Sequence, residues 1–214
     1  MSTGDQSKQW DFSEGKLALN FANTAYWHAS DEPEETLESF KDFVDWAQAA
    51  YLIEESEIHE LLQNAKQVPM DDQEALHDAL QLRECIYRIF SALARDLEPD
   101  PQDIDQVKEI MAEGLSHARI VHAGGNFSWT WDEGRNLPQR ILWRIAQSAV
   151  ELLLSNDLNR VGQCEDDRGC GWLFFDTSRN RARRWCSMES CGNRAKAQRF
   201  YQRQAQTKLD NSPS

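Results

Sequence analysis

Four of the five cysteines lie close together near the C-terminal end of the 214-residue chain. Cys164 and Cys170 form one short-spaced pair, and 15 residues later Cys186 and Cys191 form a second. Two such pairs divided by a loop are typical of segments that turn their thiolates around one tetrahedral Zn²⁺ ion. The alternative is four ordinary buried cysteines, which need no such spacing. We therefore predict one zinc ion held by these four residues.

Glycines accompany the two pairs where the backbone has to turn tightly. Gly169 and Gly171 flank Cys170, and Gly192 follows Cys191, so that backbone amides can point toward sulfur. Four cysteine ligands leave no open coordination position for water or substrate. The zinc is therefore expected to be structural, and the sequence contains no H-E-x-x-H or comparable catalytic spacing.

The residues between and after the cysteine pairs indicate the elements that position them. Residues 172–175 are apolar and predict a strand, and residues 181–185 are expected to form its return strand after a turn. From residue 194 onward the chain combines strong helix formers with no breaker. Each cysteine pair with its turn is called a knuckle, the first at Cys164–Cys170 and the second at Cys186–Cys191. The chain thus has a knuckle, a hairpin, a second knuckle and a helix, which is the order of elements in a treble-clef-like zinc finger.

Charge divides the chain into two parts. The whole chain has 23 basic and 36 acidic residues, for a net charge of −13, which by itself argues against a nucleic-acid partner. From residue 160 to the end, however, 11 basic residues outnumber 6 acidic ones, which leaves 12 basic and 30 acidic residues in 1–159. We therefore expect the two parts to face different partners.

Basic residues concentrate around the second cysteine pair. Eight of them occur between Arg179 and Arg203, with Glu189 as the single acid, and such a patch is typical of phosphate contact. In the alternative, these side chains form ion pairs with the acidic first part and dock the finger onto it. The residues predicted to bind DNA are Arg179, Arg181, Arg183, Arg184, Lys196, Arg199 and Arg203.

The predicted C-terminal helix has two faces on a helical wheel. Lys196, Arg199 and Arg203 lie within about 60° of one another and form the basic face. Arg194 lies on the far side, so we expect it to bond the knuckle or to stack rather than to contact DNA. The face opposite the basic one is expected to pack, and it carries Ala197, Phe200 and Gln204.

Residues 1–159 are expected to form a mostly helical α+β domain. After a loose tail over 1–14, alternating apolar residues at 17–22 predict a strand. Apolar periodicity predicts helices over 37–47, 58–65, 73–97, 103–115 and 138–156. A hairpin is expected around Gly124-Gly125, with Trp129 and Trp131 packed on the helices. A change of charge over 157–163 predicts the boundary with a finger at 160–208 and a flexible tail at 209–214.

Three polar residues of the first domain are candidates for binding a small effector. Arg83 lies on the apolar stripe of the helix predicted over 73–97, where an arginine needs an anionic partner. That partner is either an acid of this domain or a carboxylate or phosphate of an effector. Asn20 and Asn23 leave the predicted strand, where they line a pocket mouth or serve as turn and cap residues.

Two motifs resemble a known family. Cys191-Gly192-Asn193-Arg194, with the upstream C-x5-C pair, resembles the CGNR zinc finger of a bacterial family of proposed stress-induced transcription regulators. Residues 17–24, Leu-Ala-Leu-Asn-Phe-Ala-Asn-Thr, resemble the start of that family's N-terminal ABATE domain. The likeness spans nearly the whole chain, and it implies an α+β domain followed by a DNA-binding finger.

We expect a non-enzymatic, DNA-binding transcription regulator with one structural zinc ion, whose first domain senses an effector or forms a homodimer. The alternatives are a zinc-stapled protein-interaction module and a thiol sensor that loses zinc on oxidation. A further alternative is an enzyme with the finger as a lid, although the sequence offers no nucleophile–base constellation. The chain has neither a long apolar run nor a secretory N-terminus, so we expect a cytoplasmic protein without membrane contact.

Overall fold

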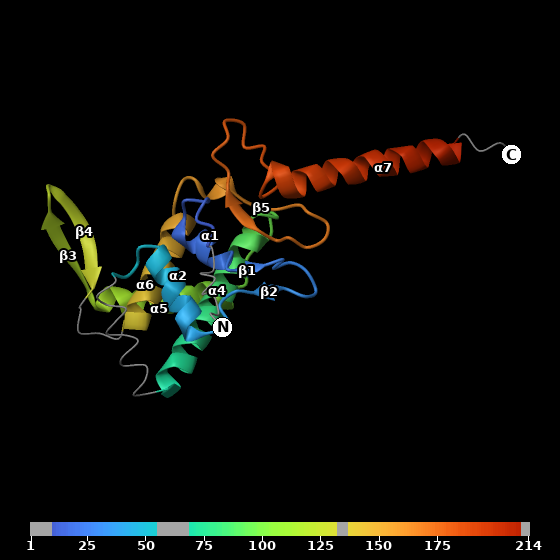
Figure 1. The fold of residues 1–214 in the computed structure, drawn as a ribbon. Helices are drawn as coiled ribbons and strands as arrows, with labels where there is room; N and C mark the ends of the chain where they lie inside the picture. Colours follow the sequence, from blue (N-terminus) through green and yellow to red (C-terminus); the bar gives the residue numbers. More distant parts are fainter. Residues whose placement is uncertain (1–9, 55–68, 132–136, 211–214) are drawn as a thin grey trace.

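The computed structural model describes residues 10–54, 69–131 and 137–210 (Figure 1). Helices dominate these ranges, and the described strands form three two-stranded antiparallel sheets. The expected α+β fold with a mostly helical first part is therefore confirmed. The helix predicted over 58–65 lies outside the described residues.

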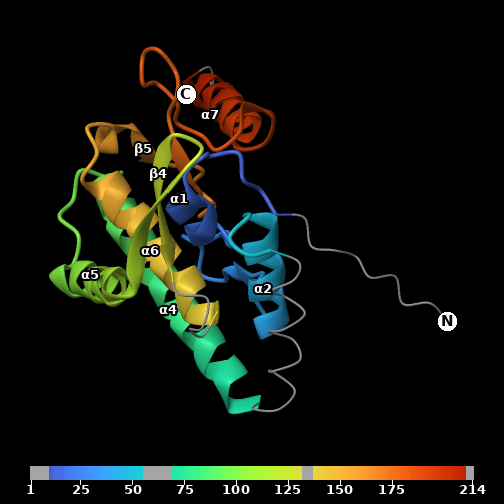
Figure 2. The same ribbon diagram turned by 90° about the vertical axis from the view of Figure 1, so that its left-hand side faces the viewer.

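Five helices of the described residues build the body of the molecule. Helices α4 and α6 pack against each other, α1 contacts both, and in Figure 2 α2 and α5 lie on opposite sides of the α4–α6 pair. Fully buried aromatic residues such as Phe21, Trp46 and Phe90 fill the core. The helices are α1 (Leu17–Ala22), α2 (Phe40–Ala49), α4 (Pro69–Leu93), α5 (Pro101–Ser116) and α6 (Leu137–Leu153).

The strand predicted at residues 17–22 is wrong, because this segment forms helix α1. Its backbone bonds are helical, with the Asn23 amide donating to the Leu19 carbonyl at 3.0 Å. Every residue from Ala18 to Ala22 is buried, so the apparent alternation of large and small residues does not separate an inner from an outer face. Leucine and alanine favour a helix when all sides of a segment are covered.

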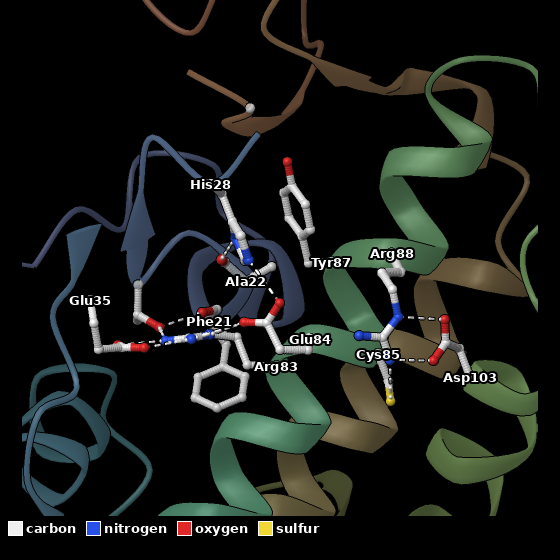
Figure 3. A network of polar contacts seen from close by, with 12 residues as sticks. Phe21, Ala22, His28, Glu35, Arg83, Glu84, Cys85, Tyr87, Arg88 and Asp103 are labelled. Carbon is white, nitrogen blue, oxygen red and sulfur yellow. Dashed lines mark hydrogen bonds and ion pairs between the residues drawn. The ribbon is translucent and has the colours of Figure 1, made fainter. Parts of the chain in front are cut away.

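The long helix α4 ends at Leu93, four residues earlier than predicted. Asp96 takes a left-handed conformation with φ of 56° and turns the chain toward α5. The next helix begins at Pro101, with the Asp100 carboxylate accepting a hydrogen bond from the Gln102 amide at 2.9 Å. Arg88 of α4 then binds Asp103 of α5, which ties the two helices together (Figure 3).

The predicted glycine hairpin is confirmed, but its packing is not. Strands β3 (Ala118–Ala123) and β4 (Asn126–Trp131) are joined by Gly124 and Gly125, both at positive φ. The hairpin stands out from the body (Figure 1). Trp131 donates its indole N–H to the Gly114 carbonyl of α5 at 3.0 Å. Trp129 is 45 % exposed, so the prediction that it packs on the helices is wrong.

The remaining sheets connect the body with the cysteine segment. Strand β1 (Ala25–Tyr26) pairs with β2 (Glu34–Glu35), and β5 (Val161–Gln163) pairs with β6 (Leu173–Phe175). The return strand predicted over 181–185 is wrong, because β6 takes its partner from the segment before the first cysteine. The Arg184 carbonyl instead accepts from the Glu165 amide at 3.0 Å. One π-helical turn, Met188–Gly192, leads into helix α7 (Asn193–Asp210).

Candidate metal centre and nucleic-acid interface

The four predicted ligands converge on one point. Their sulfur atoms all lie within 4.8 Å of one another. The Cys170 and Cys186 sulfurs are 3.8 Å apart, and those of Cys186 and Cys191 are 3.4 Å apart. Zn–S bonds of about 2.3 Å place the sulfurs of a tetrahedral site roughly 3.8 Å apart. The cluster therefore fits one structural zinc ion with Cys164 as the fourth ligand.

The four thiols also need a cation for electrostatic reasons. Hydrogen bonds from Cys170 and Cys186 lower the pKa of Cys164 well below its ordinary value. The contact with Cys164, followed by the one with Cys170, raises the pKa of Cys186 far above its ordinary value. Crowded thiols resist ionising together, because each new thiolate repels the others. The positive charge of a Zn²⁺ ion offsets the repulsion between the thiolates and allows all four of them to form.

Arg194 supports the metal centre, as the sequence predicts. Its guanidinium donates to the Cys191 sulfur at 2.8 Å and to the Asp166 carboxylate at 2.8 and 3.0 Å. Burial raises the pKa of Asp166, but hydrogen bonds from the Arg168 amide and from Arg194 lower it overall. The guanidinium also lies 5.4 Å from the centre of the Trp27 ring, on the body. Arg194 therefore links the metal ligands to both Asp166 and the body.

Two of the glycines allow the first knuckle to touch the body. The Ala29 amide donates to the Gly169 carbonyl at 3.2 Å. A Cβ on Gly169 would lie 2.6 Å from the Ser30 Cα, and one on Gly171 would lie 2.6 Å from the Ala29 nitrogen. Both glycines also have positive φ. They therefore serve the turn, as predicted, and also a close backbone contact that the sequence does not reveal.

Glu14 is the main docking residue that sequence reasoning missed. It is 5 % exposed and accepts two hydrogen bonds from Arg183, at 2.9 and 3.0 Å. It also accepts from the Trp172 indole at 3.1 Å and the Phe175 amide at 3.0 Å. The loose tail predicted over 1–14 is therefore wrong at this residue. No periodic pattern marks a lone glutamate before a helix, so only the fold exposes its role.

Arg183 belongs to this docking contact. Besides Glu14, it donates to the Cys186 carbonyl at 2.6 Å and to the Trp185 carbonyl at 3.1 Å. Its guanidinium lies 4.5 Å from the centre of the Phe174 ring. All of these partners face the body and the knuckle. For Arg183 the structure thus favours the ion-pair alternative over the predicted DNA contact.

Asn23 and Asn20 lie at the same junction. The Asn23 side chain donates to the Leu173 carbonyl at 2.8 Å and accepts from the Leu173 amide at 2.9 Å. It therefore pairs with β6 as a neighbouring strand would. Asn20 is buried in α1, and its side-chain oxygen has no partner among the described residues. Asn23 accordingly holds the finger on the body, and neither residue is seen to line a pocket.

Arg83 finds its anionic partner inside the protein. Both of its terminal nitrogens donate to the Glu35 carboxylate at 2.6 Å, and Glu84 accepts two further bonds (Figure 3). Burial lowers the pKa of Arg83, but hydrogen bonding and charge attraction from Glu35 raise it overall. The partner predicted from the acidic domain is confirmed. The guanidinium edge that an effector would need is occupied by Glu35.

The Arg83 network reaches the cysteine segment through stacked rings. Glu84 binds the His28 ring at 2.9 Å, and His28 stacks on Tyr87 with 3.5 Å between ring centres (Figure 3). The Tyr87 hydroxyl accepts from the Gln163 amide of β5 at 2.8 Å. Burial raises the pKa of Glu84, but His28 and Arg83 lower it overall to about 2.

The other predicted DNA-binding residues are exposed. Arg179 and Arg181 lie in the loop after β6, and Lys196, Arg199 and Arg203 lie on α7. Arg184 forms an ion pair with Glu165 in which both side chains are about half exposed. Arg184 and Arg199 lie over the Trp185 ring, at 5.2 and 5.4 Å from its centre. Arg184 and Arg199 of α7 therefore share one basic surface around Trp185.

The predicted packing face of α7 is wrong. Ala197, Phe200 and Gln204 are exposed, as are all other side chains described from Lys196 onward. In Figure 1 the helix leaves the body and extends away from it. A helix this polar has too little apolar surface to hold it against the body. The side chains described from Lys196 to Gln204 are therefore exposed to a partner, with Gln198 donating a hydrogen bond to the Asp167 carboxylate at 2.5 Å.

Two family models match the chain. The ABATE model, described as "Putative stress-induced transcription regulator", matches residues 15–156, and the CGNR zinc finger model matches residues 160–204. A search of curated proteins found no match. Among the described residues, no helix is both long and apolar enough to cross a bilayer.

Proposed function

Because the chain belongs to the ABATE family and carries a CGNR zinc finger, we propose that it is a transcription regulator that binds DNA through the finger. The observation that carries this proposal is α7, an 18-residue basic helix that extends from an acidic body and whose side chains are exposed from Lys196 to Gln204. The proposed phosphate contacts are Arg179, Arg181, Arg184, Lys196, Arg199 and Arg203.

The shape of this surface suits double-stranded DNA. An isolated α-helix fits the major groove, and flanking arginines and lysines contact the phosphates beside it. Arg184 supplies such a flank, because it and Arg199 of α7 both lie over the Trp185 ring. Arg183 and Arg194 stay outside the proposed contact, since buried carboxylates hold both of them.

Zinc has a structural role in this proposal. When bound, it cross-links the two knuckles, and its binding free energy becomes folding free energy of the finger. Cys191 lies in the turn that leads directly into α7, and Arg194 bonds both that ligand and Asp166. The ligands therefore fix the direction in which α7 leaves the body.

We divide the chain, as a proposal, into a regulatory body at 1–159, the finger at 160–208 and a tail at 209–214. The body contributes no proposed effector site, because Glu35 occupies Arg83 and β6 occupies Asn23. A cytoplasmic location accords with thiolates kept reduced for zinc. We propose no catalytic role for the chain.

The test is a fluorescence-anisotropy titration of the zinc-loaded protein against random duplex DNA over a range of salt concentrations. Each lost phosphate contact lowers the salt slope by about 0.9, so Lys196→Ala/Arg203→Ala should lower it by roughly 1.8. The matched control is Lys41→Ala/Lys108→Ala, which removes the same charge from surface ion pairs on the body. An unchanged slope in the first variant, or an equal change in the control, would refute the proposal.

A further inference from the structure

The hairpin β3–β4 carries an apolar face that the described chain leaves uncovered. Paired residues of antiparallel strands point to the same side of the sheet. Ile120 pairs with Trp129 and His122 pairs with Phe127, so these four side chains share one face. The opposite face carries Arg119 paired with Thr130 and Val121 paired with Ser128. The hairpin is therefore a two-sided arm with its aromatic residues on one side.

The aromatic face continues beyond the body. Its base is anchored, because Trp131 lies on this face and donates to the Gly114 carbonyl of α5. Toward the tip, Ile120 is 63 % exposed and Phe127 is 75 % exposed. The nearby α5 side chain of Leu115 is also exposed. Figure 1 shows the strands pointing away from the helices.

An uncovered arm of this kind indicates a partner. A two-stranded hairpin is at best marginally stable alone in water, and apolar patches of several hundred Å² mark interaction sites. With side chains of about 200 Å² each, the exposed parts of Ile120, Phe127 and Trp129 give this face roughly 400 Å² of apolar surface per chain. Two such faces together would bury about 800 Å², the range of a weak, concentration-dependent interface.

Charge favours a second copy of this chain as the occupant. No acidic residue occurs from Gly114 to Trp131, whereas the whole chain has a net charge of −13. Acidic bodies repel each other, so an acid-free arm standing away from the body is the surface on which two copies can meet. Polyanions are disfavoured here, because the single arginine, Arg119, lies on the opposite face.

We propose that the face formed by Ile120, His122, Phe127 and Trp129 is the interface of a two-fold symmetric homodimer. Because the same patch serves both copies, the contact is isologous and closes at two chains. The hairpin and α7 leave the body at opposite ends (Figure 1), so dimerisation leaves both α7 helices exposed. The inference deepens the proposed function by supplying a second finger for DNA, but its test uses no DNA.

The test is sedimentation equilibrium of the full-length, zinc-loaded chain from micromolar concentrations to about 100 μM. We expect a monomer–dimer equilibrium for the wild type. Ile120→Thr/Phe127→Thr keeps β-favouring residues in the hairpin and should weaken dimerisation at least about tenfold. The matched control, Val121→Thr/Ser128→Thr on the opposite face, should dimerise as the wild type does. Circular dichroism and zinc content check that all three proteins are folded.

Three results would overturn the proposal. One is a wild type that stays monomeric over the whole concentration range, and another is a dimer that both variants weaken equally. The third is a monomer whose Ile120→Thr/Phe127→Thr variant loses DNA affinity, which would assign the face to DNA instead. Failure of the α7 variants to change DNA binding would refute the proposed function while leaving this inference intact.

Discussion

The two sides of the zinc finger use the same residue type in opposite ways. Arg183 and Arg194 face the body, where Glu14 and Asp166 hold them with several hydrogen bonds each. Lys196, Arg199 and Arg203 lie on α7, where their side chains and all others described from Lys196 onward are exposed. The basic patch of the sequence therefore forms two surfaces. The docked side, with Arg183 and Arg194, holds the finger on the body, and the open side, with Lys196, Arg199 and Arg203, is exposed to a partner.

Zinc removal should lower the stability of the protein more than any substitution below, because the metal holds together the knuckles that contact the body. Without zinc the knuckles lose a binding free energy of about 10–16 kcal/mol, the range for zinc-finger peptides. Since Gly169, Asn23 and Glu14 join the finger to the body, we expect chelation to lower the thermal midpoint of the body as well. Calorimetry before and after chelation measures this. A body transition that does not move would mean that the docking contacts contribute no stability.

Glu14→Gln should be the most damaging single substitution among the polar residues that dock the finger on the body. It leaves Arg183 without its buried partner, and breaking a fully buried pair costs about 3–5 kcal/mol. Because the Arg183 side chain is 29 % exposed, we expect a loss of about 2–3 kcal/mol in the free energy of unfolding. Urea denaturation measures it. Glu165→Gln, in the exposed pair with Arg184, is the control and should cost under about 1 kcal/mol. If Glu14→Gln and Glu165→Gln lose the same free energy of unfolding, the buried ion pair contributes no more to stability than the exposed one, and the distinction between the two sides is wrong.

Acid should weaken the network beneath the docked side. The pKa of Glu84 is depressed to about 2 in the folded protein, from an ordinary value of 4.5. Its contribution is therefore present above pH 4.5 and disappears as the pH falls from about 4.5 toward 2. Since the Glu84 side chain is 36 % exposed, we expect that contribution to be roughly 1–2 kcal/mol after solvent screening.

The pH prediction is measured as a difference between two proteins. The difference in free energy of unfolding between wild type and Glu84→Gln, measured in urea, should become smaller as the pH falls from about 4.5 toward 2. Using the difference removes effects that are common to both proteins, such as loss of zinc. Glu113→Gln on the exposed side of α5 serves as the control. A difference that stays constant down to pH 2 would show that Glu84 has no depressed pKa.

Substitutions on the open side should have the smallest effect on stability. Phe200→Ala and Lys196→Ala remove side chains exposed on α7, so we expect changes within about 0.5 kcal/mol in the free energy of unfolding. Urea denaturation of both variants checks this. A loss above about 1 kcal/mol for Phe200→Ala would indicate that α7 packs against the chain.

The metal ligands could be predicted from the sequence, whereas the contacts that hold the finger on the body could not. Cysteine spacing predicts the ligands because coordination geometry restricts spacing. The position of Arg194 on the wheel likewise predicted its role. Glu14 could not be found, because its partners are more than 150 residues away along the chain. The strand predicted at 17–22 failed because α1 is buried on every side.

The most direct test compares two single substitutions, one on the docked side and one on the open side, in two assays. Arg183→Gln and Lys196→Gln each remove one charge, and each is examined by urea denaturation and by the salt dependence of DNA binding. We expect Arg183→Gln to lower stability and keep the salt slope, and Lys196→Gln to keep stability and lower the slope by about 0.9. If Arg183→Gln lowers the slope as much as Lys196→Gln does, the two sides do not differ in function and the account is wrong.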